Sequence, residues 1–143
     1  MFLGEFQHSI DDKGRIKLPA KFKDAFKETA VIMERFDSSL ALYPGATFEE
    51  NIAQRAAEMD ELDPSESAMQ EDIGASSDTV DLDKGGRILV PSRMREMAGL
   101  ESEVYLIGNI TYLAIWPKEA WEEKRKKNRE TRLVRARKMA QKK

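Results

Sequence analysis

The stretch DDKGRIKLPAKFKDAF (residues 11–26) returns in related form as DKGGRILVPSRMREMA (residues 83–98). Each contains a Gly-Arg pair followed by isoleucine, with a proline four residues after the arginine. At an offset of 72, the two stretches align without a gap; one inserted residue then aligns VIMERFDSSLALYP (31–44) with VYLIGNITYLAIWP (104–117). The apolar positions match across both alignments, so the sequence indicates an internal duplication whose period is too long for a solenoid.

The start of each copy predicts a strand, a tight turn and a second strand. Gly14 permits the positive φ that such a turn requires. In the strand that follows, Ile16 and Leu18 point to one side while Arg15 and Lys17 point to the other. The second copy repeats this alternation, so one face of each strand is expected in the core and the other in solvent.

A short helix and a β-hairpin are predicted to follow in each copy. Pro19 suits the first helical turn, and the expected apolar face comprises Phe22, Ala25 and Phe26. Gly99 is expected to end the equivalent helix of the second copy. The predicted hairpin strands are residues 30–36 with 39–44, and 103–109 with 111–117, and a further helix begins after each hairpin.

One copy alone buries too little apolar surface to be stable and leaves its sheet edges open. Two copies packed together would share a core and cap each other's edges. The expected fold is therefore α+β, β-rich, with one pseudo-two-fold, barrel-like domain. Its expected divisions are residues 5–50 (repeat 1), 51–76 (an acidic, helical-to-irregular connector), 77–123 (repeat 2) and 124–143 (a basic helix or tail).

The composition argues against several functional classes. The 143 residues include no cysteine and one histidine, His8, which argues against a disulfide framework, a thiolate nucleophile or a zinc site. No arrangement typical of a catalytic site stands out, so we expect a non-enzyme without a cofactor or a small-molecule substrate. Neither a signal peptide nor a membrane-spanning run is apparent, which predicts a cytoplasmic protein.

Charge is unevenly distributed along the chain, although the net charge is only −2. Residues 45–83 carry twelve acidic side chains and one basic one, Arg55, while residues 124–143 carry eleven basic side chains and one acidic one, Glu130. The asymmetry suggests segregated faces. A solvated acidic linker and a frayed basic tail would give the same pattern, and a basic tail of this kind would bind phosphates without selecting sequence.

These motifs resemble the MraZ family of bacterial transcriptional regulators. The matching stretches are HSIDDKGRIKLPAKF (8–22), LYP (42–44), VDLDKGGRILVPSRMRE (80–96) and IWPKEAWEE (115–123). The resemblance implies the AbrB/MazE/MraZ-like swapped-hairpin (double-split) β-barrel, with both halves in one chain. It also implies a homo-oligomeric ring, often an octamer, which binds short direct repeats in double-stranded DNA upstream of the cell division and cell wall gene cluster, with a nucleoid location and autoregulation.

The best candidate for DNA contact is the first turn with the strand after it. Arg15 and Lys17 share the outward strand face, and Lys13 lies on the turn. Arginine can read guanine with two hydrogen bonds, whereas lysine mostly neutralises phosphate. Arg15 could instead brace the turn by pairing with Asp11, and the two roles can coexist.

The other candidates are weaker. Arg87 is the equivalent of Arg15, but its outward neighbour is Leu89, and an exposed leucine is more typical of a protein interface. Lys21, like Lys23, flanks the first helix and could contact DNA or belong to an ordinary solvated face. The sequence thus leaves two functions open: a sequence-specific DNA-binding regulator, and a protein-binding module like the antitoxins of the same barrel superfamily.

Overall fold

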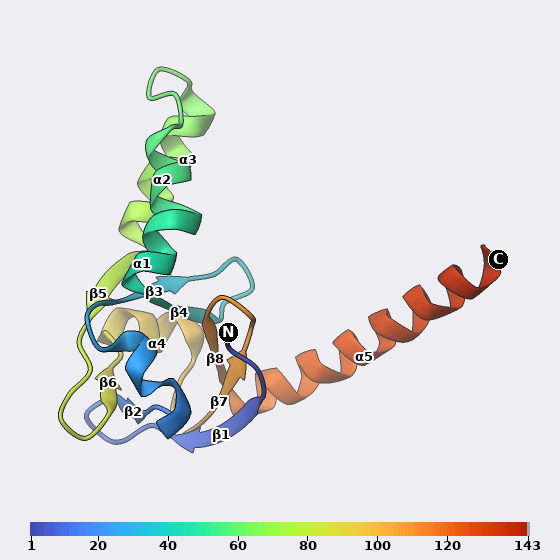
Figure 1. Cartoon of the computed structure of the whole chain (residues 1–143), viewed down its shortest axis with the longest axis horizontal. Coiled ribbons are helices and arrows are strands. Elements are labelled where there is room, and N and C mark those ends of the chain that lie inside the picture. Colours follow the sequence, from blue (N-terminus) through green and yellow to red (C-terminus); the bar gives the residue numbers. More distant parts are fainter. Residues whose placement is uncertain (143) are drawn as a thin grey trace.

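The strands form two antiparallel sheets in the computed structural model, which describes residues 1–142 (Figure 1). A six-stranded sheet has the order β1-β7-β8-β4-β3-β5, and β2 pairs with β6 in a separate two-stranded ribbon. The strands are β1 (Glu5–Ser9), β2 (Arg15–Lys17), β3 (Ala30–Glu34), β4 (Leu40–Pro44), β5 (Ser77–Val80), β6 (Arg87–Leu89), β7 (Glu103–Gly108) and β8 (Leu113–Pro117). The expected α+β class is confirmed, but the expected β-rich balance is wrong, because more residues lie in helices than in strands.

The two related segments exchange strands in this sheet. Strand β1 pairs with β7, with Gln7 opposite Tyr105, and β5 pairs with β3, with Thr79 opposite Val31. Strands β4 and β8 join the two hairpins at the centre of the sheet. The first strand of each segment therefore pairs with the hairpin of the other segment. In this way it covers a hairpin edge that would otherwise be open.

The predicted barrel does not close as a continuous ladder within residues 1–142. Strands β1 and β5 remain the two edges of the six-stranded sheet. The ribbon is joined to them only by the isolated bridges Ile10–Ile16 and Leu82–Ile88. Strands β2 and β6 have only three residues each, and the main-chain groups of Arg15 and Arg87 bond to the turn aspartates Asp11 and Asp83 instead of to an edge strand.

The main core lies between the ribbon, the six-stranded sheet and two short helices. Ile16 and Ile88 face each other across the ribbon, and neither is exposed to solvent. Alternate residues of β4 and β8 complete this core from the sheet, among them Leu42 and Ile115. The ribbon is thus fixed by the apolar residues on its inner face, which leaves its outer face free for polar side chains.

The two short helices pack with a narrower face than the sequence predicts. In η1 (Ala20–Phe26), Phe22 and Phe26 are buried, but Ala25 is exposed, so the expectation for Ala25 is wrong. The equivalent Met97 of α4 (Ser92–Ala98) is also exposed. Each short helix contacts the core along a narrow strip of its surface. The residue three positions after Phe22 or Met94 lies on the solvent side of that strip. Gly99 ends α4 with φ +70°, as expected.

A second apolar cluster covers the opposite face of the sheet. Its strand residues are the ones that alternate with the main core, such as Tyr43 in β4 and Trp116 in β8. Phe48 packs against Tyr43 with ring centroids 5.8 Å apart, and Trp121 packs against Trp116 at 5.7 Å. Because both sheet faces are buried here, β4 and β8 read as nearly continuous apolar runs.

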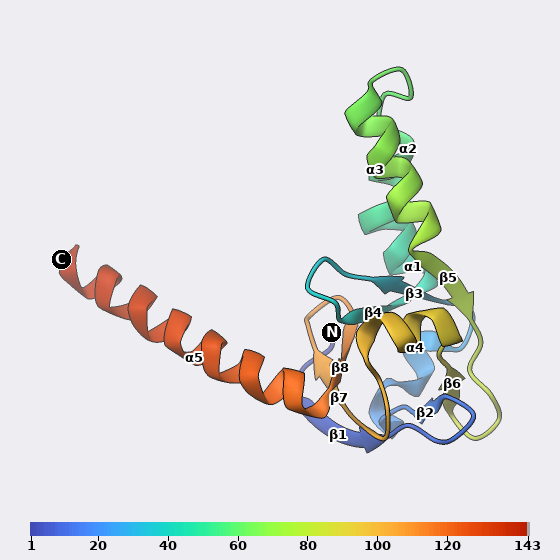
Figure 2. The same cartoon turned by 180° about the vertical axis from the view of Figure 1, so that it is seen from behind.

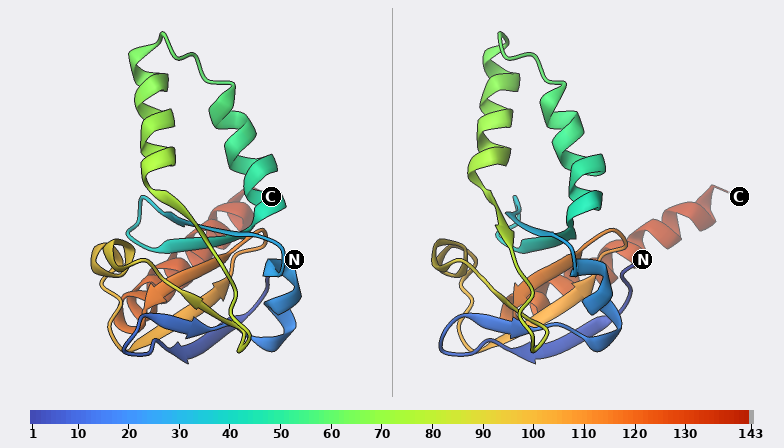
Figure 3. Two further views of the ribbon diagram at one scale, coloured as in Figure 1. Left: turned by 90° about the vertical axis from the view of Figure 1, so that its left-hand side faces the viewer. Right: turned by 60° about the vertical axis from the view of Figure 1, so that its left-hand side comes forward.

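Two helical parts project from the body in different directions (Figures 1 and 2). One is a helical hairpin that follows β4 and consists of α1 (Gly45–Phe48), η2 (Glu49–Ala53), α2 (Gln54–Ala57) and α3 (Pro64–Ala75); Figure 3 shows it rising from the sheet. The other is α5 (Lys118–Gln141), a single long helix at the C-terminal end. No helix among residues 1–142 has the length and apolar character needed to cross a membrane.

Candidate nucleic-acid interface

A carboxylate organises the turn before β2. The Oδ1 atom of Asp11 accepts the main-chain N–H groups of Lys13 at 3.0 Å and Arg15 at 2.8 Å. Its Oδ2 atom accepts Nε of Arg15 at 2.8 Å, and the Asp11 main chain bonds to that of Arg15. The ion pair predicted from the sequence is therefore present, and it holds the arginine at the start of the strand.

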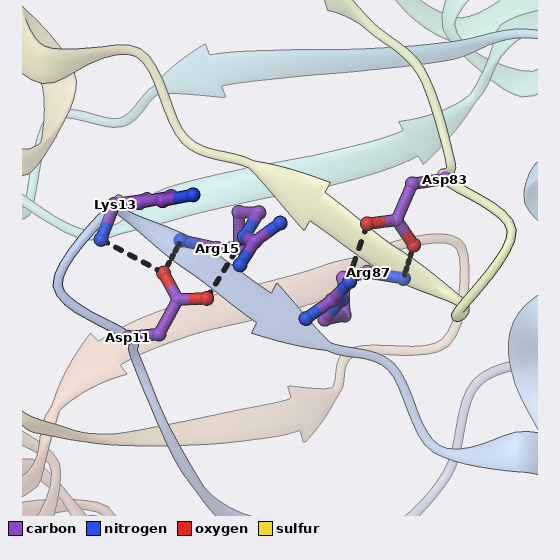
Figure 4. A network of polar contacts seen from close by, with 5 residues as sticks. All are labelled: Asp11, Lys13, Arg15, Asp83 and Arg87. Carbon is purple, nitrogen blue, oxygen red and sulfur yellow. Dashed lines mark hydrogen bonds and ion pairs between the residues drawn. The ribbon is translucent and has the colours of Figure 1, made fainter.

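The turn before β6 repeats this arrangement. The Asp83 carboxylate accepts the main-chain N–H of Arg87 at 2.9 Å and its Nε at 3.1 Å. Figure 4 shows Arg15 and Arg87 on neighbouring antiparallel strands, each beside its own aspartate. These side chains are about one third exposed, so water screens the two ion pairs and weakens their contribution to stability. Their main effect is to orient the two arginines.

Strand pairing gathers the outward side chains of both strands onto one surface. Arg15 lies opposite Leu89, and Lys17 lies opposite Arg87, while the residues between them face the core. We call these four side chains the ribbon face. In the sequence Arg15 and Arg87 are separate candidates, whereas the structure places them on one face together with the exposed Leu89.

Two further basic residues lie against the turns. Gly14 and Gly86 have φ of +88° and +76°, and a Cβ atom on either would collide with a side chain from the neighbouring helix. That side chain is Arg95 at Gly14 and Lys23 at Gly86. Lys23 and Arg95 occupy equivalent positions in the two copies, so the repeat alignment could have singled out Arg95 as it did Arg87.

Lys13 and Lys21 differ in their placement. Lys13 is exposed on the turn beside Arg15, as Figure 4 shows. The ammonium group of Lys21 instead lies 4.8 Å from the ring centroid of Phe6 and 5.1 Å from that of Phe22. A cation over aromatic rings already has a structural contact, and nothing among residues 1–142 joins Lys21 to the ribbon face.

The ribbon face has free hydrogen-bond donors as well as charge. In both arginines Nε donates a hydrogen bond to the turn aspartate. The two terminal nitrogens make no hydrogen bond within residues 1–142. Two parallel donors of this kind match the O6 and N7 acceptors of guanine or the oxygens of phosphate. The turn aspartates therefore orient the arginines without using the donors that a nucleic acid would need.

Acid is expected to loosen the turn. The main-chain N–H of Arg15 lowers the pKa of the Asp11 carboxyl below its ordinary value of 3.8, and the Arg15 guanidinium lowers it further. Because the folded-state pKa is the lower one, this stabilisation is complete above pH 3.8 and is lost as the pH falls through the folded-state value. Asp11→Asn should therefore reduce the acid dependence of stability, measured by urea unfolding between pH 5 and pH 2.5.

The matched control is Asp12→Asn, because Asp12 is the next residue and lies outside the network. It should leave the acid dependence closer to that of the unmodified protein. Equal acid dependence in Asp11→Asn and the unmodified protein would show that the turn carboxylate does not contribute.

The described residues contain no cluster of three or more His, Asp or Glu side chains suited to hold a metal ion. His8 lies in β1, where partial burial lowers its pKa.

The fold and the site together define a class of protein in which two related segments exchange strands and present one basic two-stranded ribbon.

Comparisons with known proteins place the chain within a family. Residues 1–72 and 74–142 match the family described as "MraZ protein, putative antitoxin-like". A protein of Corynebacterium urealyticum named "Transcriptional regulator MraZ" is 42% identical over 123 residues, covering 86% of this chain and 85% of the relative. The relative of that name from Thermomicrobium roseum is 39% identical over 121 residues, covering 85% and 84%. The chain belongs to the MraZ family, which confirms the resemblance seen in the sequence.

Proposed function

We propose that this protein is a sequence-specific, DNA-binding transcriptional regulator rather than an enzyme. The observation that carries the proposal is the ribbon face, where Arg15, Lys17 and Arg87 come together beside the turn residue Lys13. A two-stranded ribbon fits the major groove, where arginine reads bases and lysine holds phosphates. The names of the relatives, each a transcriptional regulator, support the same function.

Finer parts of the proposal come from the family resemblance. We propose that the protein binds short direct repeats upstream of the cell division and cell wall gene cluster and regulates its own gene, in the cytoplasm at the nucleoid. We also propose a homo-oligomeric ring, possibly an octamer, in which repeated ribbon faces engage tandem sites and weak contacts add up through avidity. Residues 5–50 and 77–123 would be the two halves of a swapped-hairpin barrel, separated by the connector 51–76 and followed by the basic segment 124–143.

A second candidate function is a protein-binding module without sequence readout. Two observations favour it: the family description includes the term "antitoxin-like", and Leu89, which is 55% exposed, lies beside the basic residues of the ribbon face. An exposed leucine among cations suits a protein partner with an acidic rim.

Footprinting and a salt series test the proposal. We expect protection of direct repeats in the DNA upstream of the protein's own gene. We also expect the affinity for random duplex to fall steeply between 50 mM and 200 mM salt, because released counterions drive phosphate binding. Absence of a footprint together with a shallow salt dependence would refute DNA reading and leave the protein-binding alternative.

A further inference from the structure

The two projecting parts of the molecule carry opposite charges. The acidic hairpin, residues 45–75, has a single basic residue, Arg55, and nine acidic ones: Glu49, Glu50, Glu58, Asp60, Glu61, Asp63, Glu66, Glu71 and Asp72. The basic arm, residues 126–141 of α5, has a single acidic residue, Glu130, and seven basic ones: Lys126, Lys127, Arg129, Arg132, Arg135, Arg137 and Lys138. Every residue of the basic arm is exposed.

The basic arm also carries an apolar seam that the body of the protein does not cover. Leu133, Ala136 and Ala140 share one side of the helix at spacings of three and four residues, and Leu133 is 58% exposed. Met139 lies three residues after Ala136 and is exposed, and Val134 is exposed on another side of the helix. A phosphate backbone would neutralise the charges but would leave this seam exposed to water. A protein surface can neutralise the charges and also bury the seam.

An isolated helix with this composition has little intrinsic stability. Most helical stability in proteins comes from tertiary packing, and like charges three or four residues apart, such as Arg132 and Arg135, repel each other. The first turns of α5 are anchored on β1, where Glu5 accepts Nε1 of Trp121 at 2.6 Å and pairs with Arg125. The basic arm beyond them has no comparable support within residues 1–142, so a partner would stabilise it.

The acidic hairpin of the same chain is out of reach of the basic arm. From Lys118 to Lys142 the sequence contains neither glycine nor proline, so α5, while helical, has no hinge at which to turn back. Figures 1 and 2 show the hairpin and α5 leaving the body in different directions. A contact between the two therefore has to form between different copies of the chain.

The acidic hairpin offers a surface that matches the basic arm. Its helices are braced by Gln70, whose amide donates to the main-chain oxygens of Ala56 at 2.7 Å and Met59 at 3.3 Å. Met69 is 50% exposed on α3, between Glu66 and Asp72. At 1.5 Å per residue, α3 is about 18 Å long and the basic arm about 24 Å, so the arm can lie along the whole of α3.

We propose that the basic arm of one copy docks along the acidic hairpin of the next copy, with the apolar seam against the exposed methionine. Because the two surfaces differ, the contact is head-to-tail, and it forms a ring where the rotation between neighbouring copies closes. It leaves the ribbon faces free. The proposal goes beyond the proposed DNA reading and does not depend on it.

Charge reversal tests the docking with the full-length chain. The arm variant is Arg129→Glu with Arg137→Glu, which flank the seam, and the hairpin variant is Glu66→Lys with Asp72→Lys. A fully swapped chain carries all four changes. The control, Glu28→Lys with Glu101→Lys, makes the same charge change as the hairpin variant at exposed sites away from it. Light scattering reports the native mass against 16.3 kDa per chain, and circular dichroism reports folding.

The unmodified protein and the control should have a mass several times that of one chain, and should dissociate as salt rises from 0.1 M to 1 M. The arm and hairpin variants should each lose at least half of the assembled mass. The fully swapped chain should regain it, and an equimolar mixture of the two variants should form mixed assemblies.

Two results with the variants would overturn the docking: either variant keeps the assembled mass, or the folded, fully swapped chain stays dissociated. If the arm variant keeps its mass but loses affinity for random duplex, the basic arm contacts phosphates instead. The salt series on the unmodified chain decides the matter even if a variant fails to fold, since an assembly whose mass does not change up to 1 M salt contradicts a charge-driven contact.

Discussion

Replacing Arg15 with alanine is expected to remove most of the preference for the operator over random duplex while leaving the protein folded. Within residues 1–142 the terminal nitrogens of Arg15 make no hydrogen bond, and Asp11 orients the side chain through Nε. Removal of one bidentate contact to guanine costs roughly 1–3 kcal/mol of discrimination, a factor of about 5 to 150 for each engaged site. Competition binding with operator and random duplexes measures the change.

Two matched variants separate reading from charge. Arg15→Lys keeps the positive charge but lacks the planar pair of donors. Its preference for the operator over random duplex should therefore be as low as that of Arg15→Ala, while its affinity for random duplex should be closer to that of the unmodified protein. Lys17→Ala, on the same face, should weaken all duplexes alike and reduce the salt slope by about 0.9 for each phosphate that is no longer neutralised. If folded Arg15→Ala prefers the operator as strongly as the unmodified protein, Arg15 only braces the turn.

The second large effect is expected in the core beneath the ribbon face. Ile88 is fully buried opposite Ile16, and its truncation to alanine leaves a cavity that short strands cannot easily close. Such truncations cost about 2–5 kcal/mol, which is a large fraction of a typical stability of about 5–15 kcal/mol. Urea unfolding should show a clearly lower midpoint with an unchanged slope.

Leu89→Ala is the control on the same strand, one residue further along and on the outer face. Its side chain is 55% exposed, so truncation should change stability by no more than about 0.5 kcal/mol. A large destabilisation at Leu89 that depends on protein concentration would show that the ribbon face is buried in a protein contact, as the alternative function requires.

Much of the local structure could be predicted because it depends on neighbours in the chain. Alternation around Ile16 indicated β2, and Pro19 marked the start of η1. The hairpin connections fall where expected, with Ser38 and Ile110 at positive φ in the two turns. The helix after each hairpin begins after Pro44 and Pro117, as predicted, although the length of α5 was not.

The expectations that were wrong or incomplete depend on distant parts of the chain. Burial of Ala25 was predicted from helical spacing, but how η1 tilts on the core decides which edge is covered. The duplication predicts a barrel-like domain, but the strands form no continuous barrel within residues 1–142, because the main-chain groups of Arg15 and Arg87 bond to their turn aspartates and not to an edge strand. The repeat alignment pairs Arg95 with Lys23, but the position of Arg95 against Gly14 arises only when the two copies pack together.

The sequence by itself determined the duplicated pattern of strands, turns and helices, the two Asp-Arg turns and the segregation of charge. These follow from residue type and short spacing, which act through local sterics and hydrogen bonds. Only the tertiary structure placed Arg15, Lys17 and Arg87 on one face, because a register that pairs Lys17 with Arg87 joins residues 70 positions apart. That register is set by burial of Ile16 against Ile88 in the shared core, which neither copy can form alone.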